Sequence, residues 1–290
     1  MADHARSLPV HLLPHHLLSR AVLAATRVRR RWWKELLIRG FVRWFGIDLG
    51  EAAEPDPEAY GCFNDFFTRA LRPGVRPLAE GLDAVTSPND GWVSEIGSID
   101  GDRVLQAKGR YYSVSELLGG GDERVALFRG GRFATLYLSP RDYHRVHMPY
   151  RGSLVETVYV PGRLFAVAPH SVRTTPRLFA RNERLVALFD TAAGPMAVVL
   201  VGALMVGCIE TVWSGVVTPP HGRRIRLTDH RAPPIVLERG EEMGRFNMGS
   251  TVILLFGPEA VRWEPGLRAG APVKMGQLLG HIRESRGAAS

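Results

Sequence analysis

The feature that most constrains this chain is the apolar run Val252–Phe256, which directly follows a Gly-Ser-Thr step at residues 249–251. Five consecutive apolar residues that end at Gly257–Pro258 predict a short buried strand. Gly249 has no Cβ, which leaves its carbonyl carbon open to approach, and Ser250 places a hydroxyl one residue away. This arrangement suits attack of the Ser250 hydroxyl on the Gly249 carbonyl, although an ordinary turn entering a strand has the same composition.

Short strand-like segments dominate the chain after residue 90, and clusters of Gly, Pro, Asn and Asp separate most of them. The expected strands are Val93–Ile99, Arg103–Ala107, Phe133–Leu138, Leu154–Val160 and Leu185–Phe189. The uncharged run Met196–Ile209 predicts two buried strands joined at a bend, the second continuing to Trp213, and residues 214–235 resemble a loop. Short helical segments are expected over Cys62–Leu71 and Ser113–Leu118. The sequence therefore predicts a mainly β (α+β) fold with a compact β-sandwich or barrel-like core.

Two amphipathic helices are expected before this core. Apolar residues recur there at helical spacing, namely Leu12, Leu13, Leu17, Leu18, Val22 and Leu23, and then Trp32, Trp33, Leu36, Leu37, Phe41, Val42, Trp44 and Phe45. Neither run is an uncharged stretch long enough to span a bilayer. We expect residues 1–47 to form a membrane-associating helical segment and residues 48–290 to form a β-rich catalytic domain, with a polar, Pro-bearing linker over residues 48–60.

The net charge of +8 is concentrated at the N-terminus. Residues 1–47 hold nine Lys and Arg against two acidic residues, a net charge of +7. Tryptophans interleaved with basic residues are typical of a helix in an anionic membrane interface. A helix pair packed on the protein's own core is the alternative, and nucleic acid is not expected as a partner because no recognised module follows. The chain shows no signal-peptide pattern, and its two cysteines, Cys62 and Cys208, fit buried thiols in a reducing compartment.

Candidate catalytic groups lie in two further segments. His144 and His147 sit three residues apart between Pro140 and Pro149, where a turn could bring both imidazoles to one cavity. No metal is expected, because the chain has neither an HExxH motif nor a Cys/His cluster. Asp90 lies in an ordinary turn signature.

A carboxylate, an imidazole and a hydroxyl at Asp90, His147 and Ser250 could activate the serine, either for self-cleavage or for a serine hydrolase. The Gly-x-Ser-x-Gly elbow of many hydrolases is absent around Ser250, and a strand rather than a helix is expected to follow it.

Spaced motifs from about residue 60 to the C-terminus extend these observations. They are Phe66–Arg69, Pro88–Gly91, Lys108–Gly109 with Tyr112–Ser113, Pro140–Pro149, Val160–Phe165, Gly207–Trp213 and Gly240–Thr251. Together they resemble the phosphatidylserine decarboxylases, pyruvoyl enzymes that generate their own prosthetic group. In that family the cleavage motif is usually Leu-Gly-Ser-Thr, and Met248 here replaces the leucine with a residue of similar volume.

The resemblance implies a mechanism and a set of roles. Asp90, His147 and Ser250 would form the self-cleavage triad, cutting between Gly249 and Ser250 into chains 1–249 and 250–290. Ser250 would become a covalent pyruvoyl group, through which phosphatidylserine is decarboxylated to phosphatidylethanolamine and CO2 by way of a Schiff base. His144 would be the proton donor or a phosphate ligand, and Tyr137 is a candidate for the wall of the substrate pocket.

The resemblance also implies a zymogen of phospholipid biosynthesis at the cell membrane. We expect a peripheral enzyme on the cytoplasmic side, with phosphatidylserine, the anionic membrane surface and its own cleaved chains as partners, and a homodimer as a further partner state. Two alternatives remain from the residues alone. One is a serine hydrolase that uses Asp90, His147 and Ser250 without self-cleavage, and the other is a non-catalytic lipid-binding β-domain.

Overall fold

Strand β15 (Thr251–Phe256) runs through the middle of the main sheet, and all six of its residues are buried. It pairs antiparallel with β9 (Gly194–Val201) on one side and with β5 (Arg132–Tyr137) on the other. Side chains on both of its faces pack into the core, which explains the continuous apolar run in place of an alternating pattern. The computed structural model describes residues 15–204, 208–247 and 250–283.

The main sheet has nine strands and does not close into a barrel. At one edge β12 and β13 both pair with β7, and at the other edge β17 pairs with β2. In order, its strands are β12 (Arg226–Asp229), β7 (Gly152–Val160), β8 (Arg184–Thr191), β9, β15, β5, β2 (Gly91–Ser98) and β17 (Pro272–Val273), with β13 (Ile235–Leu237) also on β7.

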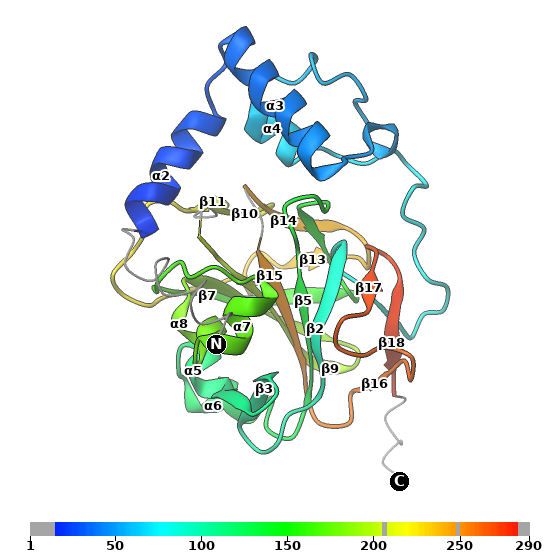
Figure 1. The fold of residues 1–290 in the computed structure, drawn as a ribbon. Helices are drawn as coiled ribbons and strands as arrows, with labels where there is room; N and C mark the ends of the chain where they lie inside the picture. Colours follow the sequence, from blue (N-terminus) through cyan, green and yellow to red (C-terminus); the bar gives the residue numbers. More distant parts are fainter. Residues whose placement is uncertain (1–14, 205–207, 248–249, 284–290) are drawn as a thin grey trace, which may run out of the picture.

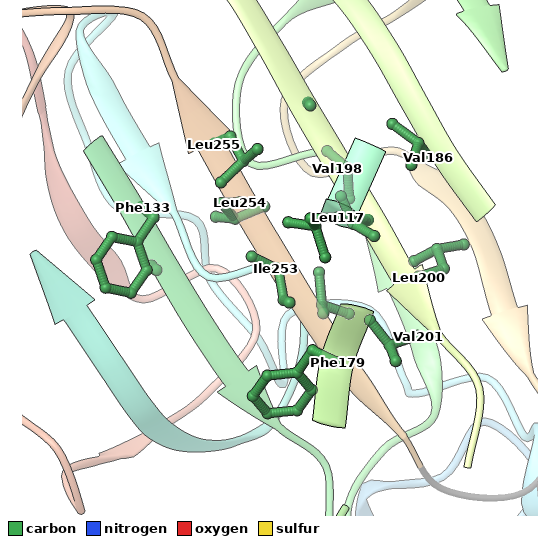
Figure 2. Close-up of a cluster of buried hydrophobic side chains, with 14 of the residues drawn as sticks. Leu117, Phe133, Phe179, Val186, Val198, Leu200, Val201, Ile253, Leu254 and Leu255 are labelled. Carbon is green, nitrogen blue, oxygen red and sulfur yellow. The ribbon is translucent and has the colours of Figure 1, made fainter. Parts of the chain in front are cut away.

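Short helices pack on this sheet and complete its core (Figure 1). They are α5 (Val114–Leu118), α6 (Asp122–Ala126), α7 (Pro169–Thr174) and α8 (Leu178–Arg181). Figure 2 shows Leu117 of α5 and Phe179 of α8 in one cluster with Val198 of β9 and Ile253 of β15. Burial of such side chains is the main favourable term in holding these layers together.

Three smaller sheets flank the main one. The sheet that matters for the site contains β11 (Gly215–Thr218), β10 (Ile209–Thr211), β14 (Glu242–Phe246) and β6 (Arg145–His147). The other two contain β1 (Ala84–Thr86), β18 (Leu278–Ile282) and β16 (Val261–Trp263), and the hairpin of β3 (Arg103–Ala107) with β4 (Arg110–Ser113).

The N-terminal helices α2 (His15–Thr26) and α3 (Arg31–Phe45) lie with α4 (Phe63–Phe67) at one end of the molecule (Figure 1). Helix α3 ends where Gly46 adopts a left-handed conformation, and its N–H bonds the Val42 carbonyl. A one-turn 3-10 helix (Leu49–Glu51) then starts the connection to α4. None of the helices within the described residues combines the length and apolar character that a bilayer crossing requires.

Helices α3 and α4 share a second, smaller hydrophobic cluster. Its buried members are Ile38, Tyr60, Phe63, Phe66 and Phe67, with Leu37, Phe41, Val42, Ile47 and Leu49 packed against them. The cluster therefore joins residues from both sides of the domain boundary expected at residue 47. The division of the chain into residues 1–47 and 48–290 stays a prediction.

The predicted fold class is confirmed: the protein is mainly β, with helices before a compact sheet core. The expectation of a loop over residues 214–235 is wrong, because β11, β12 and the first residue of β13 fall within it. All four residues of β12 are exposed, so backbone pairing with β7 forms this edge strand without an apolar pattern in the sequence.

Candidate active site

Four strands of the main sheet bring their ends together around Ser250. Thr251, at the start of β15, pairs with Tyr137 at the end of β5 and with Val201 at the end of β9. Tyr137 also pairs with Trp92, near the start of β2. Because these strands are antiparallel, the residues that precede β2 and β15 lie at the same end of the sheet.

The small sheet brings both histidines of the Pro140–Pro149 segment to this end. Strand β6 pairs antiparallel with β14, the strand that leads toward Ser250. The Phe246 N–H donates to the His144 carbonyl oxygen at 3.0 Å. The His147 N–H donates to the carbonyl oxygen of Pro88 at 2.8 Å, which places β6 beside the turn that carries the predicted carboxylate.

Ser250 is fully buried. Its hydroxyl donates to the carbonyl oxygen of Val201, and its own carbonyl oxygen accepts from the Leu138 N–H at 2.8 Å. These two bonds hold the residue against strands on both sides of β15. Gly249, the other half of the predicted cleavage site, lies outside the described residues.

The partners of His147 define its tautomer. Nδ1 lies 2.8 Å from the Gly240 carbonyl oxygen, and Nε2 lies 2.9 Å from the Tyr143 hydroxyl. Because a carbonyl oxygen only accepts, Nδ1 carries the hydrogen and Nε2 accepts from Tyr143. Burial lowers the pKa of His147 in spite of the Gly240 bond, which acts in the opposite direction. A neutral imidazole with a lone pair on Nε2 is the form that a general base requires.

His144 is buried completely and has one unused nitrogen. Nδ1 lies 2.7 Å from the Asp142 carbonyl oxygen and therefore carries the hydrogen. Nε2 is buried and has no hydrogen-bond partner among the described residues. The ring packs on Phe67 with 4.1 Å between ring centroids, and burial lowers the pKa of His144 to about 3. This imidazole is thus neutral, with a free acceptor in a dry environment.

Asp90 is 2% exposed and is held by positive and backbone groups. Arg76 donates through Nε to Oδ1 at 3.0 Å and through Nη2 to Oδ2 at 2.7 Å. The Met275 N–H donates to Oδ1 at 2.8 Å, and Lys274 Nζ lies 3.3 Å from Oδ2. Burial alone would raise the pKa of Asp90, but the hydrogen bonds from Arg76 and Met275 outweigh it and lower that pKa. Asp90 is therefore a buried, ionised carboxylate.

Gly91 allows the turn that carries Asp90 to approach β5. Its φ is +152°, and a Cβ added there would lie 2.1 Å from the carbonyl oxygen of Tyr137. No other residue fits this contact without displacing the backbone of β2 or β5. The position of Asp90 beside the end of β5 therefore depends on a glycine at residue 91.

The three residues of the predicted triad share one end of the sheet, but within the described residues no hydrogen bond joins them. The carboxylate of Asp90 is bonded to Arg76 and not to His147, and Nε2 of His147 is bonded to Tyr143 and not to Ser250. Asp90 nevertheless acts electrostatically on His147, slightly opposing the fall of its pKa. Catalytic hydrogen bonds are often incomplete in a resting structure. The triad roles stay a prediction.

Two cavities adjoin these residues. Tyr137 lines a largely apolar cavity of about 440 Å3, together with Trp92, Glu95, Lys108 and Val172 among others. Asp90 and Tyr143 line a second cavity of about 330 Å3 with Arg69 and Arg76. His144 lines neither cavity. The predicted roles of Tyr137 and His144 toward the substrate stay predictions.

Sequence reasoning did not identify Arg76 as part of this region, and it assigned no role to Asn247 within the Gly240–Thr251 motif. Asn247 follows β14, donates from Nδ2 toward Cys208 Sγ at 2.9 Å, and accepts at Oδ1 from Asn64 at 2.8 Å. Arg76 lies in a Pro- and Gly-bearing stretch that carries no motif. Both residues bond partners distant in sequence, so no local pattern could have indicated these contacts.

Comparison with known proteins gives a consistent result. A family model described as phosphatidylserine decarboxylase matches residues 63–281, and a second, described as PSD, matches residues 6–46. The chain is 54% identical over 273 residues to the phosphatidylserine decarboxylase proenzyme of Methylococcus capsulatus, covering 94% of this chain and 95% of that protein. It is 55% identical over 282 residues to the proenzyme of Azotobacter vinelandii, covering 97% and 99%. The corresponding values for Pseudomonas aeruginosa are 54% over 277 residues, 95% and 96%.

Proposed function

Because the chain belongs to the phosphatidylserine decarboxylase family and is therefore a carboxy-lyase, we propose that it first cuts itself between Gly249 and Ser250. The products are chains 1–249 and 250–290, which stay associated. The processed enzyme then converts phosphatidylserine to phosphatidylethanolamine and CO2. The homodimer implied by the family resemblance stays a prediction.

The observation that carries this proposal is the position of Ser250 between two anchored strands. On its C-terminal side β15 is paired along its whole length, and on its N-terminal side β14 is paired with β6 and β10. A cut between them leaves β14 paired in the small sheet and β15 paired in the main sheet, and only the residues between the two strands gain freedom. A serine hydrolase would instead need this hydroxyl open to an external substrate, and Ser250 has no exposed surface.

Self-cleavage uses groups at this end of the sheet. The Ser250 hydroxyl leaves its bond to Val201, attacks the Gly249 carbonyl carbon and passes its proton to Nε2 of His147, and the peptide bond is replaced by an ester. Loss of the Ser250 α-proton then breaks the Cβ–O bond, which releases the Gly249 carboxylate and leaves dehydroalanine. Hydrolysis of that group gives ammonia and the pyruvoyl group. Before Nε2 of His147 can accept this proton, the Tyr143 hydroxyl must break its hydrogen bond to that nitrogen. The Tyr143 hydroxyl therefore has to move before His147 acts as a base.

The surroundings of Ser250 fit a covalent pyruvoyl group. The position is buried, and its carbonyl oxygen is fixed by the Leu138 N–H. When present, the pyruvoyl group supplies an electron sink for the carbanion character that develops as CO2 leaves. The protein's part is to exclude water, to orient the substrate amine and carboxylate, and to hold a proton ready nearby. Tyr137 and the cavity beside it supply one wall for the substrate.

His144 is our candidate for the second reaction, as proton donor or as partner of the substrate phosphate. In the uncut chain its ring is covered by Phe67, and its backbone is tied to Phe246 at the end of β14. Cleavage after Gly249 frees the chain end that follows Phe246. We propose that this freedom opens a path for water and substrate to Nε2 of His144, which then takes up the proton that donation or a phosphate contact requires, so that decarboxylation waits for processing.

The N-terminal helices are proposed to hold the enzyme at the cytoplasmic surface of an anionic membrane. Trp32, Leu36 and Trp44 of α3 are 67%, 62% and 85% exposed, and Leu17 of α2 is 66% exposed. An apolar groove of about 450 Å3 lies between the two helices. Exposed tryptophans on a basic segment favour the interface of an anionic bilayer.

Intact mass of the purified full-length chain tests self-cleavage. We expect two fragments that meet at Gly249 and Ser250, with the shorter fragment blocked to Edman chemistry. Ser250→Ala should stay in one piece, because no hydroxyl remains to attack, and Ser171→Ala, which alters another buried serine, should still be cut. Cleavage at the same bond in Ser250→Ala would refute the proposed mechanism.

His144→Ala tests the division between the two reactions. We expect this variant to be cut and to carry the pyruvoyl group, yet to form little phosphatidylethanolamine. A raised KM with near-normal turnover would assign His144 to the phosphate, and a loss of turnover would assign it to proton donation. An uncut His144→Ala chain, with His230→Ala processed normally, would place His144 in the cleavage machinery instead.

A further inference from the structure

A second cluster of titratable side chains lies apart from the residues of the proposed chemistry. It consists of His16 of α2, Glu183 just before β8, and His221 in the segment between β11 and β12. One ligand-type atom from each lies within 4.8 Å of the others, and the two imidazole centroids are 4.5 Å apart. No motif spacing predicts this group, because three distant segments supply it.

Each histidine of the cluster has one nitrogen bonded and one left over. Nε2 of His16 lies 3.1 Å from the Gly162 carbonyl oxygen, and Nδ1 of His221 lies 2.8 Å from Oε2 of Glu183. Both acceptors lack hydrogen, so these two nitrogens donate, and the lone pairs sit on Nδ1 of His16 and Nε2 of His221. Both of those atoms are buried and have no hydrogen-bond partner among the described residues.

The groups around the two histidines are rigidly held. Glu183 is 1% exposed, and its Oε1 accepts from the Tyr159 hydroxyl at 2.5 Å. A Cβ on Gly162 would lie 2.5 Å from backbone atoms of Asn182 and Glu183, so the turn that supplies the Gly162 carbonyl packs directly on the start of β8. A histidine whose second N–H is bonded to a carboxylate or a carbonyl is the usual arrangement around a protein-bound metal.

We propose that His16, Glu183 and His221 form a binding site for a divalent transition metal, with Zn2+ as the expected ion. Nδ1 of His16 and Nε2 of His221 are the nitrogen ligands. Glu183 orients His221 from the opposite, Nδ1 side of its ring, and water molecules complete a tetrahedral set. Imidazole donors suit Zn2+ better than Mg2+ or Ca2+, which prefer oxygen ligands alone.

Metal at this site fastens helix α2 to the sheet. His16 belongs to α2, whereas Glu183 and His221 belong to the β core, so one ion would bridge the two. The neighbouring His15 ring packs edge-on against Phe165 at 5.4 Å, which already brings this end of α2 onto the same turn. The ion would convert that contact into a fixed attachment of a proposed membrane helix.

Calorimetric titration of the untagged, chelator-treated full-length chain with ZnCl2 tests the proposal. We expect about one ion per chain, with the affinity lowered at least 10-fold in His16→Ala and in His221→Asn. His221→Asn keeps an amide that can donate to Glu183 in place of Nδ1–H while removing the lone-pair nitrogen Nε2, so its effect reports ligation and not loss of that hydrogen bond. His281→Ala is the matched control, because His281 also lies beside two carboxylates, Asp83 and Glu264.

Circular dichroism and self-cleavage confirm that each variant is folded, and hydrogen exchange provides a second measurement. Zn2+ should slow exchange in α2 of the unaltered chain and of His281→Ala, and should leave α2 unchanged in His16→Ala. The proposal is overturned if the unaltered chain binds no Zn2+. It is equally overturned if folded His16→Ala and His221→Asn bind Zn2+ as tightly as His281→Ala, which would place the ion elsewhere on the surface.

Discussion

At the scale of single residues, burial and the hydrogen-bond partners together set the protonation state of each side chain in the site. Asp90 and His144 are both almost inaccessible to water, yet they end in opposite states. Asp90 stays ionised because Arg76 and the Met275 N–H bond its oxygens. For His144, burial outweighs the hydrogen bond to Asp142 and the charge of Asp90, and the imidazole is neutral. The same burial therefore yields a fixed negative charge in one position and an uncharged lone pair in the other.

The neutral state of His144 predicts an acid-sensitive fold. Its pKa is about 3 in the folded chain against 6.5 in the unfolded chain, so the unfolded state binds more protons as the pH falls below 6.5. The contribution of neutral His144 to the free energy of unfolding is therefore complete above pH 6.5. It falls by about 1.4 kcal/mol per pH unit as the pH drops toward 3. Urea unfolding of the uncut Ser250→Ala chain, followed across this range, measures the loss.

The matched variant for this prediction is His144→Asn on the Ser250→Ala background. Its side-chain amide can donate to the Asp142 carbonyl in place of Nδ1–H but cannot take up a proton. We expect the stability difference between the two chains to shrink as the pH falls below 6.5, by about 1.4 kcal/mol per unit. Parallel pH dependences would mean that His144 does not titrate between the folded and unfolded states in this way.

At the scale of elements, helix α3 packs one side against α4 and leaves another side exposed. Ile38 and Phe41 pack toward α4 in the smaller cluster, whereas Trp32, Leu36 and Trp44 follow a four-residue spacing on the exposed side. The basic side chains are not all available to a membrane, because Arg31 and Arg39 are paired with Glu35 and Glu58. Apolar contacts of the exposed stripe are therefore expected to carry much of the membrane affinity.

Trp44→Glu should weaken binding to anionic vesicles by about 10-fold or more, because a buried aromatic side chain contributes roughly 1.5–3 kcal/mol on transfer from water. Cosedimentation of the full-length chain with vesicles measures this. Leu82→Glu introduces the same charge at a residue that is 94% exposed outside the N-terminal helices, and it should bind like the unaltered chain. Equal binding by Trp44→Glu and Leu82→Glu would show that this stripe is not the contact surface.

At the scale of the whole molecule, the N-terminal helices and the catalytic core are coupled through α4. Phe63, Phe66 and Phe67 pack against α3, and Phe67 also lies under the ring of His144. Asn64 of the same short helix bonds Asn247, which lies next to the proposed cleavage segment. Helix α3, which is proposed to contact the membrane, is thus separated from His144 by the side chains of α4.

Deletion of residues 1–47 should therefore disturb more than membrane binding. It removes α3 and uncovers the three phenylalanines of α4, so we expect a lower midpoint of thermal unfolding, a tendency to aggregate and slower self-cleavage. Deletion of residues 1–14 leaves α2 and α3 in place and serves as the control. A chain of residues 48–290 that unfolds and processes like this control would show that the two parts are independent.

Some of this organisation follows from the sequence because it depends on neighbouring residues. The apolar run after Ser250 predicts a buried strand, and the basic, tryptophan-rich N-terminus predicts amphipathic helices, since both patterns repeat at the period of the element itself. Edge strand β12 was not predicted, because its residues show no such repeating pattern. Its four residues are exposed, and only pairing with β7 makes them a strand.

The sequence by itself determined the central strand, the helical N-terminus and the residue types available for chemistry, because these are local properties. Only the tertiary structure decided which groups meet. Arg76 with Asp90, Tyr143 with His147, and His16 with Glu183 and His221 are set by strand register and by the packing of distant segments. Those partners, and the burial that surrounds them, determine protonation and proton transfer. Neither is encoded in the spacing of residues along the chain.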